Sequence, residues 1–345
     1  MAGLSDQLLV AAILGYLLAM LGYAAEYSFG GRRAVTPARE RDLVGAATAA
    51  SGAAAAAGSV AQATDGAVAA AGALPVDPAS PGRAPATPFP GGGRASAFGR
   101  AAVVLTVIAV LAHGGTVLTR GLSAGRVPWG NMYEFVLAVT LVGSLAWLAV
   151  LFTRPALRPL GLYVALVQVL LLGLAGMVLY TAVAPLVPAL NSYWLAIHVT
   201  AAVIASGVFL VGFVTAAMYL IRAGHDGGKR RFPYSLGERL PAAEGLERLT
   251  FRLTVFAFPI WTFAVIAGAI WAEAAWGRYW GWDPKETWAF ISWVVYAGYL
   301  HARATPSMKR TTVAWIAVLG WATMLMNLFG VNIFFEGLHS YADID

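Results

Sequence analysis

The sequence predicts an all-α polytopic membrane protein with about eight transmembrane helices. Of its 345 residues, 59% are hydrophobic and only 12% are charged, and the mean hydropathy is +0.70. The apolar residues gather in runs close to the roughly 20 residues that a helix needs to cross a bilayer. Lys and Arg lie in short segments beside these runs, so membrane orientation explains the net charge of +6 better than nucleic-acid binding does. We therefore expect a lipid bilayer as the surroundings and no nucleic-acid partner.

The eight expected spans follow one another along the chain. They cover residues 8–26, 99–119, 132–152, 161–182, 193–221, 252–272, 288–304 and 311–330. The first span does not resemble a cleaved signal, because no basic residue precedes it and Arg32 and Arg33 follow it, the reverse of a signal's charge order. We expect it to be retained, with its N-terminus outside.

Lys and Arg are distributed unevenly between the two sides of these spans. With the N-terminus outside, 19 of the 23 basic residues fall on one side, which the positive-inside rule assigns to the cytoplasm. The other side keeps Arg120, Arg126, Arg278 and Lys285. Both termini are therefore expected to be extracytoplasmic, together with the loop before the seventh span.

Three regions are expected along the chain. Residues 1–26 form the first transmembrane helix, and residues 99–345 form a seven-helix membrane domain with a tryptophan-rich extracytoplasmic loop at 272–288. Residues 27–98, between them, are dominated by Ala, Gly, Pro and Ser and show no evident core. We expect this middle region to be a disordered cytoplasmic linker.

Residues 276–288 are the segment that general membrane-protein composition explains least. Part of the segment has a simple interpretation, because Asp283, Pro284 and Glu286 form a good helix start. Single tryptophans also collect at membrane interfaces. The density of flat indoles in a loop interrupted by glycines nevertheless favours a binding site for a broad, flat ligand. The residues that supply these faces and gaps are Trp276, Gly277, Trp280, Gly281, Trp282 and Trp288.

A second segment on the same side, residues 126–134, has two interpretations. Asn131 and Glu134 form a capping-box pattern at the start of the third span, so the segment reads as a turn followed by a helix cap. Its Pro128-Trp129-Gly130 sequence also lies on the same face as the tryptophan-rich loop. The segment can therefore line the same site.

His198 and His339 are the candidate metal ligands on the outer side. Imidazole is rare in membrane spans and indicates a functional site there. His198 lies about five residues into the fifth span and His339 about nine residues beyond the last one, so both can flank the tryptophan-rich loop. Two neutral imidazoles beside an aromatic platform suit axial ligation of a haem iron. For each histidine alone, hydrogen bonding within the bundle is the alternative.

His301 indicates a second, inner site, because it falls near the cytoplasmic end of the seventh span. At a rise of about 1.5 Å per residue, His113 lies much farther from the cytoplasmic end of the second span than His301 lies from that end of the seventh span. This difference in depth argues against pairing the two histidines. A second ligand for an iron at His301 is therefore expected from a partner protein. The chain contains no cysteine, so no thiolate of its own can bind a metal.

The basic residues retained on the outer side fit the two propionates of a haem. Arg278 and Lys285 lie within the tryptophan-rich loop, and Arg120 and Arg126 are nearby candidates for the same role. Arginine is suited to bidentate contact with a carboxylate. The alternative is that these residues face lipid phosphates or water.

These residues together resemble a known family. The stretch from Trp276 to Trp288 is similar to the tryptophan-rich "WWD" signature of haem-handling proteins. The order His198, signature, His301 and His339, with the upstream segment 128–134, resembles the CcsA/ResC family (also called CcsB) of system II c-type cytochrome biogenesis. The resemblance covers about residues 100–345.

The resemblance implies a role for each of these residues. His198 and His339 would hold an outer, non-covalent haem b over the signature, to which Asp283 also belongs. His301 would contribute to an inner haem whose second histidine comes from a ResB/CcsB-like membrane partner. The protein would lie in the plasma membrane of a bacterium and move haem from the cytoplasmic to the outer face. There it would present the haem to an apocytochrome c, whose Cys-x-x-Cys-His thiols form the covalent bonds.

Whether such a protein is an enzyme is a matter of definition, because the bonds join groups on the haem and on the apocytochrome. As an enzyme, it would be a cytochrome c haem lyase or synthase acting within a complex. Two other classes use similar sites: a membrane haem exporter without attachment activity, and a transmembrane electron-transfer haem subunit. Electron transfer requires two complete histidine pairs in one chain, and His301 lacks a partner at its own depth.

Overall fold

The computed structural model describes residues 2–29, 93–184 and 192–339, and the secondary structure in these ranges is helical with no strand. The all-α prediction is therefore confirmed. The long helices are α1 (Ala2–Phe29), α3 (Gly93–Ala124), α4 (Met132–Thr153), α5 (Gly161–Met177), α6 (Tyr193–Asp226), α7 (Ala243–Trp276), α8 (Pro284–Ala304) and α9 (Arg310–Leu325). Shorter elements are the 3-10 helices η1 (Pro155–Leu160) and η3 (Tyr234–Arg239), the π-helical turn η4 (Met326–Gly330) and the helix α10 (Val331–Phe334).

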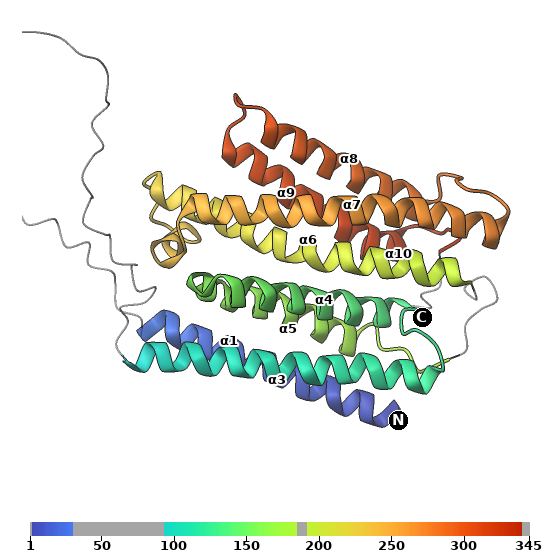
Figure 1. The fold of residues 1–345 in the computed structure, drawn as a ribbon, viewed down its shortest axis with the longest axis horizontal. Coiled ribbons are helices and arrows are strands. Elements are labelled where there is room, and N and C mark those ends of the chain that lie inside the picture. The colour runs from blue at the N-terminus through green and yellow to red at the C-terminus, as the bar shows by residue number, and fades with distance from the viewer. Residues whose placement is uncertain (1, 30–92, 185–191, 340–345) are drawn as a thin grey trace, which may run out of the picture. The chain divides into compact units, whose positions relative to one another are not determined.

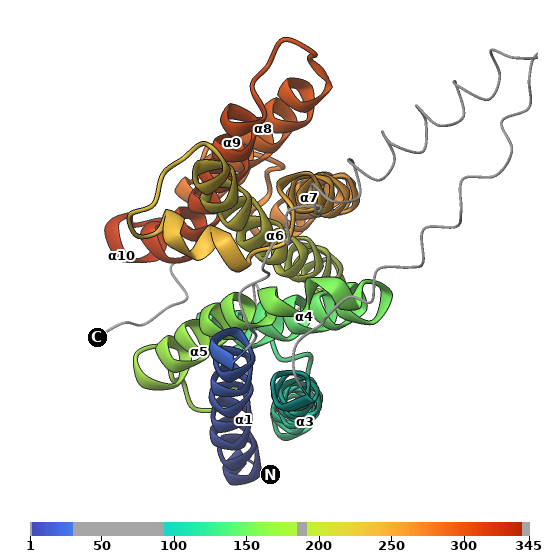
Figure 2. The same cartoon turned by 90° about the vertical axis from the view of Figure 1, so that its left-hand side faces the viewer.

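The helices are arranged in layers, with α4 and α5 between the α1–α3 pair and the group α6 to α9 (Figures 1 and 2). α6 is the central helix, since it packs against α4, α7 and α9 and carries buried residues on all its faces. A helix that is apolar all round is expected in such an interior position. The candidate site is built around its N-terminal part.

Seven helical segments of the described chain are long and apolar enough to cross a membrane. The remaining expected span, 288–304, forms α8, which runs between the same two ends of the bundle as α7 and α9 (Figure 1). Helix α8 is less apolar than these seven segments because polar residues lie near its ends, among them Lys285, Glu286, His301 and Arg303. The chain is therefore a multi-pass membrane protein, as predicted.

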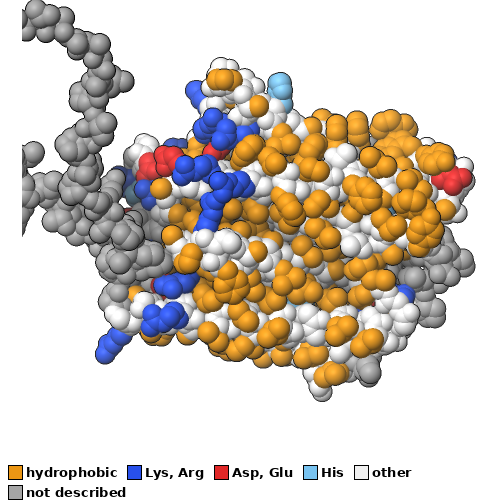
Figure 3. All heavy atoms as spheres, viewed as in Figure 1, with side chains coloured by type: hydrophobic (Ala, Val, Ile, Leu, Met, Phe, Trp, Pro, Cys, Tyr) orange, Lys and Arg blue, Asp and Glu red, His pale blue; other side chains and the backbone are white. Residues whose placement is uncertain are grey.

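Basic side chains gather at one end of the bundle, where α1 ends and α3 begins (Figure 3). This end also carries Arg154 and Arg158 after α4, and the connections from α6 to α7 and from α8 to α9. The loops from α3 to α4 and from α7 to α8 lie at the opposite end (Figure 1). The two segments that the sequence places on one face therefore share one end of the bundle.

Several helices extend beyond the expected spans, and this changes the predicted boundaries. Helix α3 begins at Gly93, within the expected linker 27–98, and most of that linker lies outside the described residues. The expected loop 272–288 is much shorter, because α7 continues to Trp276 and α8 begins at Pro284. Gly277 caps the C-terminus of α7, and its φ of 70° is the left-handed conformation that glycine adopts at helix ends.

The first helix is attached to the rest of the bundle by polar contacts inside the membrane region. Tyr16 Oη donates to Ser144 Oγ at 2.8 Å, which joins α1 to α4. Glu26 forms a largely buried ion pair with Arg158 of η1. These contacts make α1 part of the same helical assembly, although the sequence suggests a separate region.

Candidate functional site

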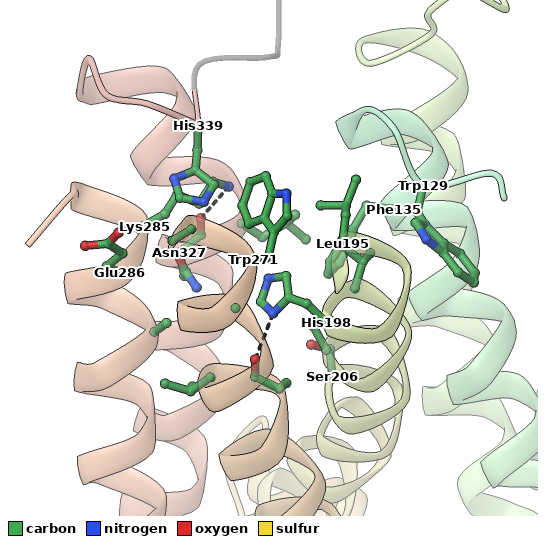
Figure 4. Close-up of a pocket in the computed structure, with 18 of the residues that line it drawn as sticks. Trp129, Phe135, Leu195, His198, Ser206, Trp271, Lys285, Glu286, Asn327 and His339 are labelled. Atoms are coloured by element: carbon green, nitrogen blue, oxygen red, sulfur yellow. Dashed lines mark hydrogen bonds between the residues drawn. The ribbon is translucent and has the colours of Figure 1, made fainter. Parts of the chain in front are cut away.

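A pocket opens at the end of the bundle opposite the basic end, between α4, α6, α7, α8, α9 and the π-helical turn η4. Its walls are mainly aromatic and aliphatic, with a few polar groups at one side (Figure 4). The tryptophans of the lining come from three parts of the chain that are far apart in sequence: Trp129, then Trp261, Trp271, Trp276 and Trp280, and finally Trp321. Such a concave, mostly apolar site with few polar groups is typical of a ligand-binding pocket.

His198 enters this pocket from the second turn of α6, and its ring orientation is fixed by α7. Its Nδ1 lies 2.8 Å from the carbonyl oxygen of Ala264, so Nδ1 carries the proton and the lone pair is on Nε2. Gly268 makes this approach possible, because a Cβ there would lie 2.7 Å from the imidazole ring. A neutral imidazole held by its second nitrogen is the usual arrangement of a histidine metal ligand.

His339 reaches the same pocket from the segment that follows α10. Its Nδ1 lies 2.9 Å from Asp283 Oδ1, and Asp283 Oδ2 accepts the Leu338 N–H at 2.7 Å. Asp283 therefore holds both the ring of His339 and the backbone that precedes it. A carboxylate behind a histidine raises the basicity of a metal-binding imidazole and fixes its direction.

Trp271, a buried residue of α7, connects the two histidines although it lies outside the tryptophan-rich segment 276–288. Its indole is nearly parallel to the His198 ring, with centroids 6.1 Å apart, and meets the His339 ring at 5.6 Å (Figure 4). Trp276 also contacts His339, at 4.9 Å. The structure thus brings His198 and His339 to one aromatic cluster.

The predicted helix start at Asp283 is confirmed, because Asp283 and Glu286 form a complete capping box at α8. Asp283 has a second partner in His339, which the sequence pattern did not indicate. Burial alone would raise the pKa of Asp283, but the hydrogen bonds from His339 and the Leu338 N–H outweigh it and hold the pKa below its usual value. The carboxylate is therefore ionised at neutral pH.

The four tryptophans of residues 276–288 do not form one platform. Trp276 and Trp280 line the pocket, whereas Trp282 is 64% exposed and packs edge-to-face on Trp280 and Phe290. Trp288, in the first turns of α8, is not part of the lining. The turn before α8 therefore places Trp280 in the pocket lining and leaves Trp282 exposed.

The four basic residues near this end of the bundle also separate into two groups. Lys285 lines the pocket and donates from Nζ to the Asn327 carbonyl at 3.0 Å, and burial lowers its pKa to about 8. Arg278 instead forms an ion pair with Glu286 at 3.1 Å. Arg120 and Arg126 both pair with Glu134. Lys285 is therefore the basic side chain of this set that directly lines the pocket.

The remaining candidates lie away from this pocket. His301 is exposed on α8, three residues before its end. His113 is fully buried in α3, with its Nδ1 3.4 Å from Tyr16 Oη, in the contact between α1, α3 and α4. These two histidines lie on helices in different layers of the bundle, α3 and α8 (Figure 2).

Several pocket residues were not identified from the sequence. Gly268 and the Ala264 carbonyl orient His198, and Asn327 supplies the carbonyl that receives Lys285. Asn327 lies in the π-helical turn η4, a distortion that often marks a functional site. A glycine within an otherwise continuous apolar span was the available signal for Gly268, since glycine there indicates a close approach.

Known proteins resemble this chain over the part that contains the pocket. The model of the family described as "Cytochrome C assembly protein" matches residues 129–339. The "Cytochrome c biogenesis protein CcsA" of Guillardia theta is 36% identical over 239 residues, which are 65% of this chain and 79% of that protein. The protein of the same name from Prochlorococcus marinus is 35% identical over 248 residues, 64% of this chain and 78% of the relative.

A solved structure also shares the fold. "Cytochrome c Heme Lyase CcmF" superposes with a TM-score of 0.54 at 17% identity, covering 95% of this chain and 46% of CcmF, so this chain spans less than half of that protein's length. The family match begins at Trp129 and ends at His339, which are both pocket residues. With pocket, fold and sequence match in agreement, the chain belongs to the cytochrome c assembly protein family.

Proposed function

We propose that this chain, in its role in cytochrome c biogenesis, binds haem b non-covalently in the pocket between His198 and His339 and presents it to an apocytochrome c. The observation that supports this proposal is the convergence of two imidazoles whose Nδ1 atoms are both engaged, by Ala264 and by Asp283. These two imidazoles would hold a haem iron. The aromatic lining fits the flat macrocycle.

The residues of this chain bind and orient the haem, and the haem supplies the vinyl groups to which the thiols of the apocytochrome add. Asp283 holds the His339 ring, and Gly268 and Ala264 hold the His198 ring. Trp276 and Trp280 provide flat apolar surface. Lys285 is placed to attract a propionate at the polar side of the pocket. Fixing the haem in one orientation lowers the entropic cost of a reaction with the apocytochrome.

The proposal places the pocket on the extracytoplasmic side of a bacterial plasma membrane. It is supported by the basic side chains at the opposite end of the bundle, which the positive-inside rule assigns to the cytoplasm (Figure 3). His301 lies towards that basic end, near the end of α8. We assign it to an inner haem site that a ResB-like membrane partner completes, from which haem passes to the pocket.

Covalent attachment distinguishes this function from haem export. The chain and its partner would be co-expressed with an apocytochrome c, and covalently bound haem would be detected by haem staining after denaturing electrophoresis. We expect attachment that depends on His198 and His339. If haem reaches the outer face while the apocytochrome remains unmodified, the chain is an exporter and the attachment role is wrong.

A further inference from the structure

The two loops beside the pocket follow the same residue pattern. Each contains an arginine, a Trp-Gly pair, a helix-capping residue and, eight positions after the arginine, a glutamate. The two segments are Arg126-Val127-Pro128-Trp129-Gly130-Asn131-Met132-Tyr133-Glu134 and Arg278-Tyr279-Trp280-Gly281-Trp282-Asp283-Pro284-Lys285-Glu286. The first connects α3 to α4 and the second connects α7 to α8.

In the first loop the glutamate anchors the turn. Glu134 Oε2 accepts the Gly130 N–H at 2.8 Å and the Arg126 guanidinium at 2.8 Å. Its other oxygen accepts from Arg120 Nε at 2.9 Å. Glu134 is fully buried, and its own N–H donates to the capping side chain of Asn131.

The glutamate of the second loop makes the corresponding contacts. Glu286 Oε2 accepts the Gly281 N–H at 2.8 Å and the Asp283 N–H at 3.1 Å. Its other oxygen accepts from Arg278 at 3.1 Å. In the second loop the Trp-Gly pair lies one position earlier, so Trp282 separates it from the cap Asp283, and Trp282 adopts a φ of 58°. This left-handed conformation is costly for a bulky residue, so the surrounding contacts must hold it in place.

Both anchored turns deliver a tryptophan to the pocket, Trp129 from the first and Trp280 from the second. Trp129 and Glu286 lie on opposite sides of His198 and Trp271 (Figure 4). The two Arg–Glu pairs therefore hold opposite walls of one pocket.

We propose that Glu134, together with Arg126, is a positioning residue of the haem site. This inference rests on the proposed haem-binding function. The carboxylate of Glu134 holds the Trp129–Gly130 turn that lines one side of the pocket, and Glu286 with Arg278 holds the opposite wall. A buried ion pair adds little net stability compared with apolar packing, but a satisfied polar network fixes one geometry.

The test compares Glu134→Gln with Glu26→Gln in the full-length chain. Glu26 is the matched control, because it is also a buried glutamate paired with an arginine, at the opposite end of the bundle. Haem affinity is measured by titration with haem, and the environment of Trp129 by fluorine NMR of the haem-free protein carrying 5-fluorotryptophan, with Trp129→Phe to assign its signal. We expect Glu134→Gln to weaken haem binding by about tenfold and to shift the Trp129 signal. Glu26→Gln should change neither.

A double-mutant cycle separates positioning from general destabilisation. Trp129→Ala should weaken haem binding in the wild-type background and have a much smaller effect in Glu134→Gln, because the turn is already displaced. Trp282→Ala, at an exposed indole outside the pocket, should combine additively with Glu134→Gln. If Glu134→Gln does not fold, Arg126→Gln replaces it in the same cycle.

The outcomes test the haem-binding function and the positioning role of Glu134 separately. If the wild-type chain does not bind haem, the proposed function is wrong. If the wild type binds haem and the cycle with Trp129 is additive, the positioning role is wrong while haem binding stands. Coupling with Trp129, a shifted Trp129 signal and unchanged bis-imidazole absorption together support the role, because Glu134 would then act on the wall and not on the ligands.

Discussion

The two ends of the bundle each carry a candidate haem-ligating histidine, but in different surroundings. At one end, His198 and His339 meet in an aromatic pocket, and each has its Nδ1 held by a residue of another segment. Towards the other end, His301 lies exposed on α8 among basic residues. The first arrangement supplies two imidazoles and their supports from one chain. The second supplies one imidazole on an accessible helix face, which suits a site completed by another chain.

This difference predicts the largest effect. His198→Ala and His339→Ala should each remove the bis-imidazole spectrum and weaken haem binding by about 100-fold or more, because a direct ligand is lost. His301→Ala should leave the outer haem unchanged in the chain purified without a partner. Visible spectra of the reduced proteins measure both. An unchanged spectrum in the first two variants would contradict the outer-site assignment.

A smaller effect is expected when the support of His198 is changed and the ligand is kept. The Cβ of Gly268→Ala would lie 2.7 Å from the imidazole, so the ring must shift or the helices must separate. Overpacking of this kind costs about 1–3 kcal/mol, which corresponds to about tenfold or more in haem affinity. Gly298→Ala is the control, since a Cβ there meets no atom within 4 Å. Equal haem affinities for the two variants would show that the position of His198 against α7 does not matter.

Asp283→Asn tests the support of His339. Asparagine keeps the helix cap but removes the negative charge behind the imidazole, and we expect haem affinity to fall by about tenfold. The pKa of Asp283 is held below its usual value, so its stabilising contribution is present at neutral pH and is lost as the pH falls through that lowered pKa. When haem retention is measured against pH, the wild type should show a loss of haem as Asp283 becomes protonated, and Asp283→Asn should not show this transition. A transition of unchanged position and size would exclude Asp283 as its cause.

The smallest effect is expected at Lys285. Burial lowers its pKa to about 8, so the side chain is charged at neutral pH and loses its charge as the pH rises through about 8. Attraction of a haem propionate should decrease over the same range, by a few-fold in affinity. The Lys285→Met variant should bind haem more weakly than the wild type at neutral pH, and its haem affinity should not change as the pH rises through about 8. Arg278→Gln is the comparison, because Arg278 pairs with Glu286. A stronger effect of the Arg278 variant would transfer the propionate role to it.

Much of the fold could be predicted from the sequence, because its determinants are local. Apolar runs of spanning length identify helices, and the distribution of Lys and Arg identifies the two ends. The helix start at Asp283 follows from four neighbouring residues. The helix boundaries were less predictable. Helices α6 and α7 are each 34 residues long, because each extends beyond its apolar run. Helix propensity and packing, which hydropathy does not measure, decide where these helices end.

The candidate site was predictable in its residue types and not in its contacts. The sequence indicated that His198, His339 and a tryptophan-rich loop belong to one face. It did not separate Trp276 and Trp280, which line the pocket, from Trp282 and Trp288, because that difference depends on a turn of seven residues between two helices. Neither did it identify Trp271 as the indole that touches both histidines.

The sequence by itself determined the fold class, the density of flat side chains and the presence of histidines near one face. The tertiary structure alone decided which groups support the two imidazoles. Asp283 meets His339 across 56 residues and His198 meets the Ala264 carbonyl across 66 residues, and no local pattern encodes such contacts. The physical reason is that hydropathy and capping act between neighbours in the chain, whereas the orientation of an imidazole depends on hydrogen bonds that exist only after separate helices have packed together.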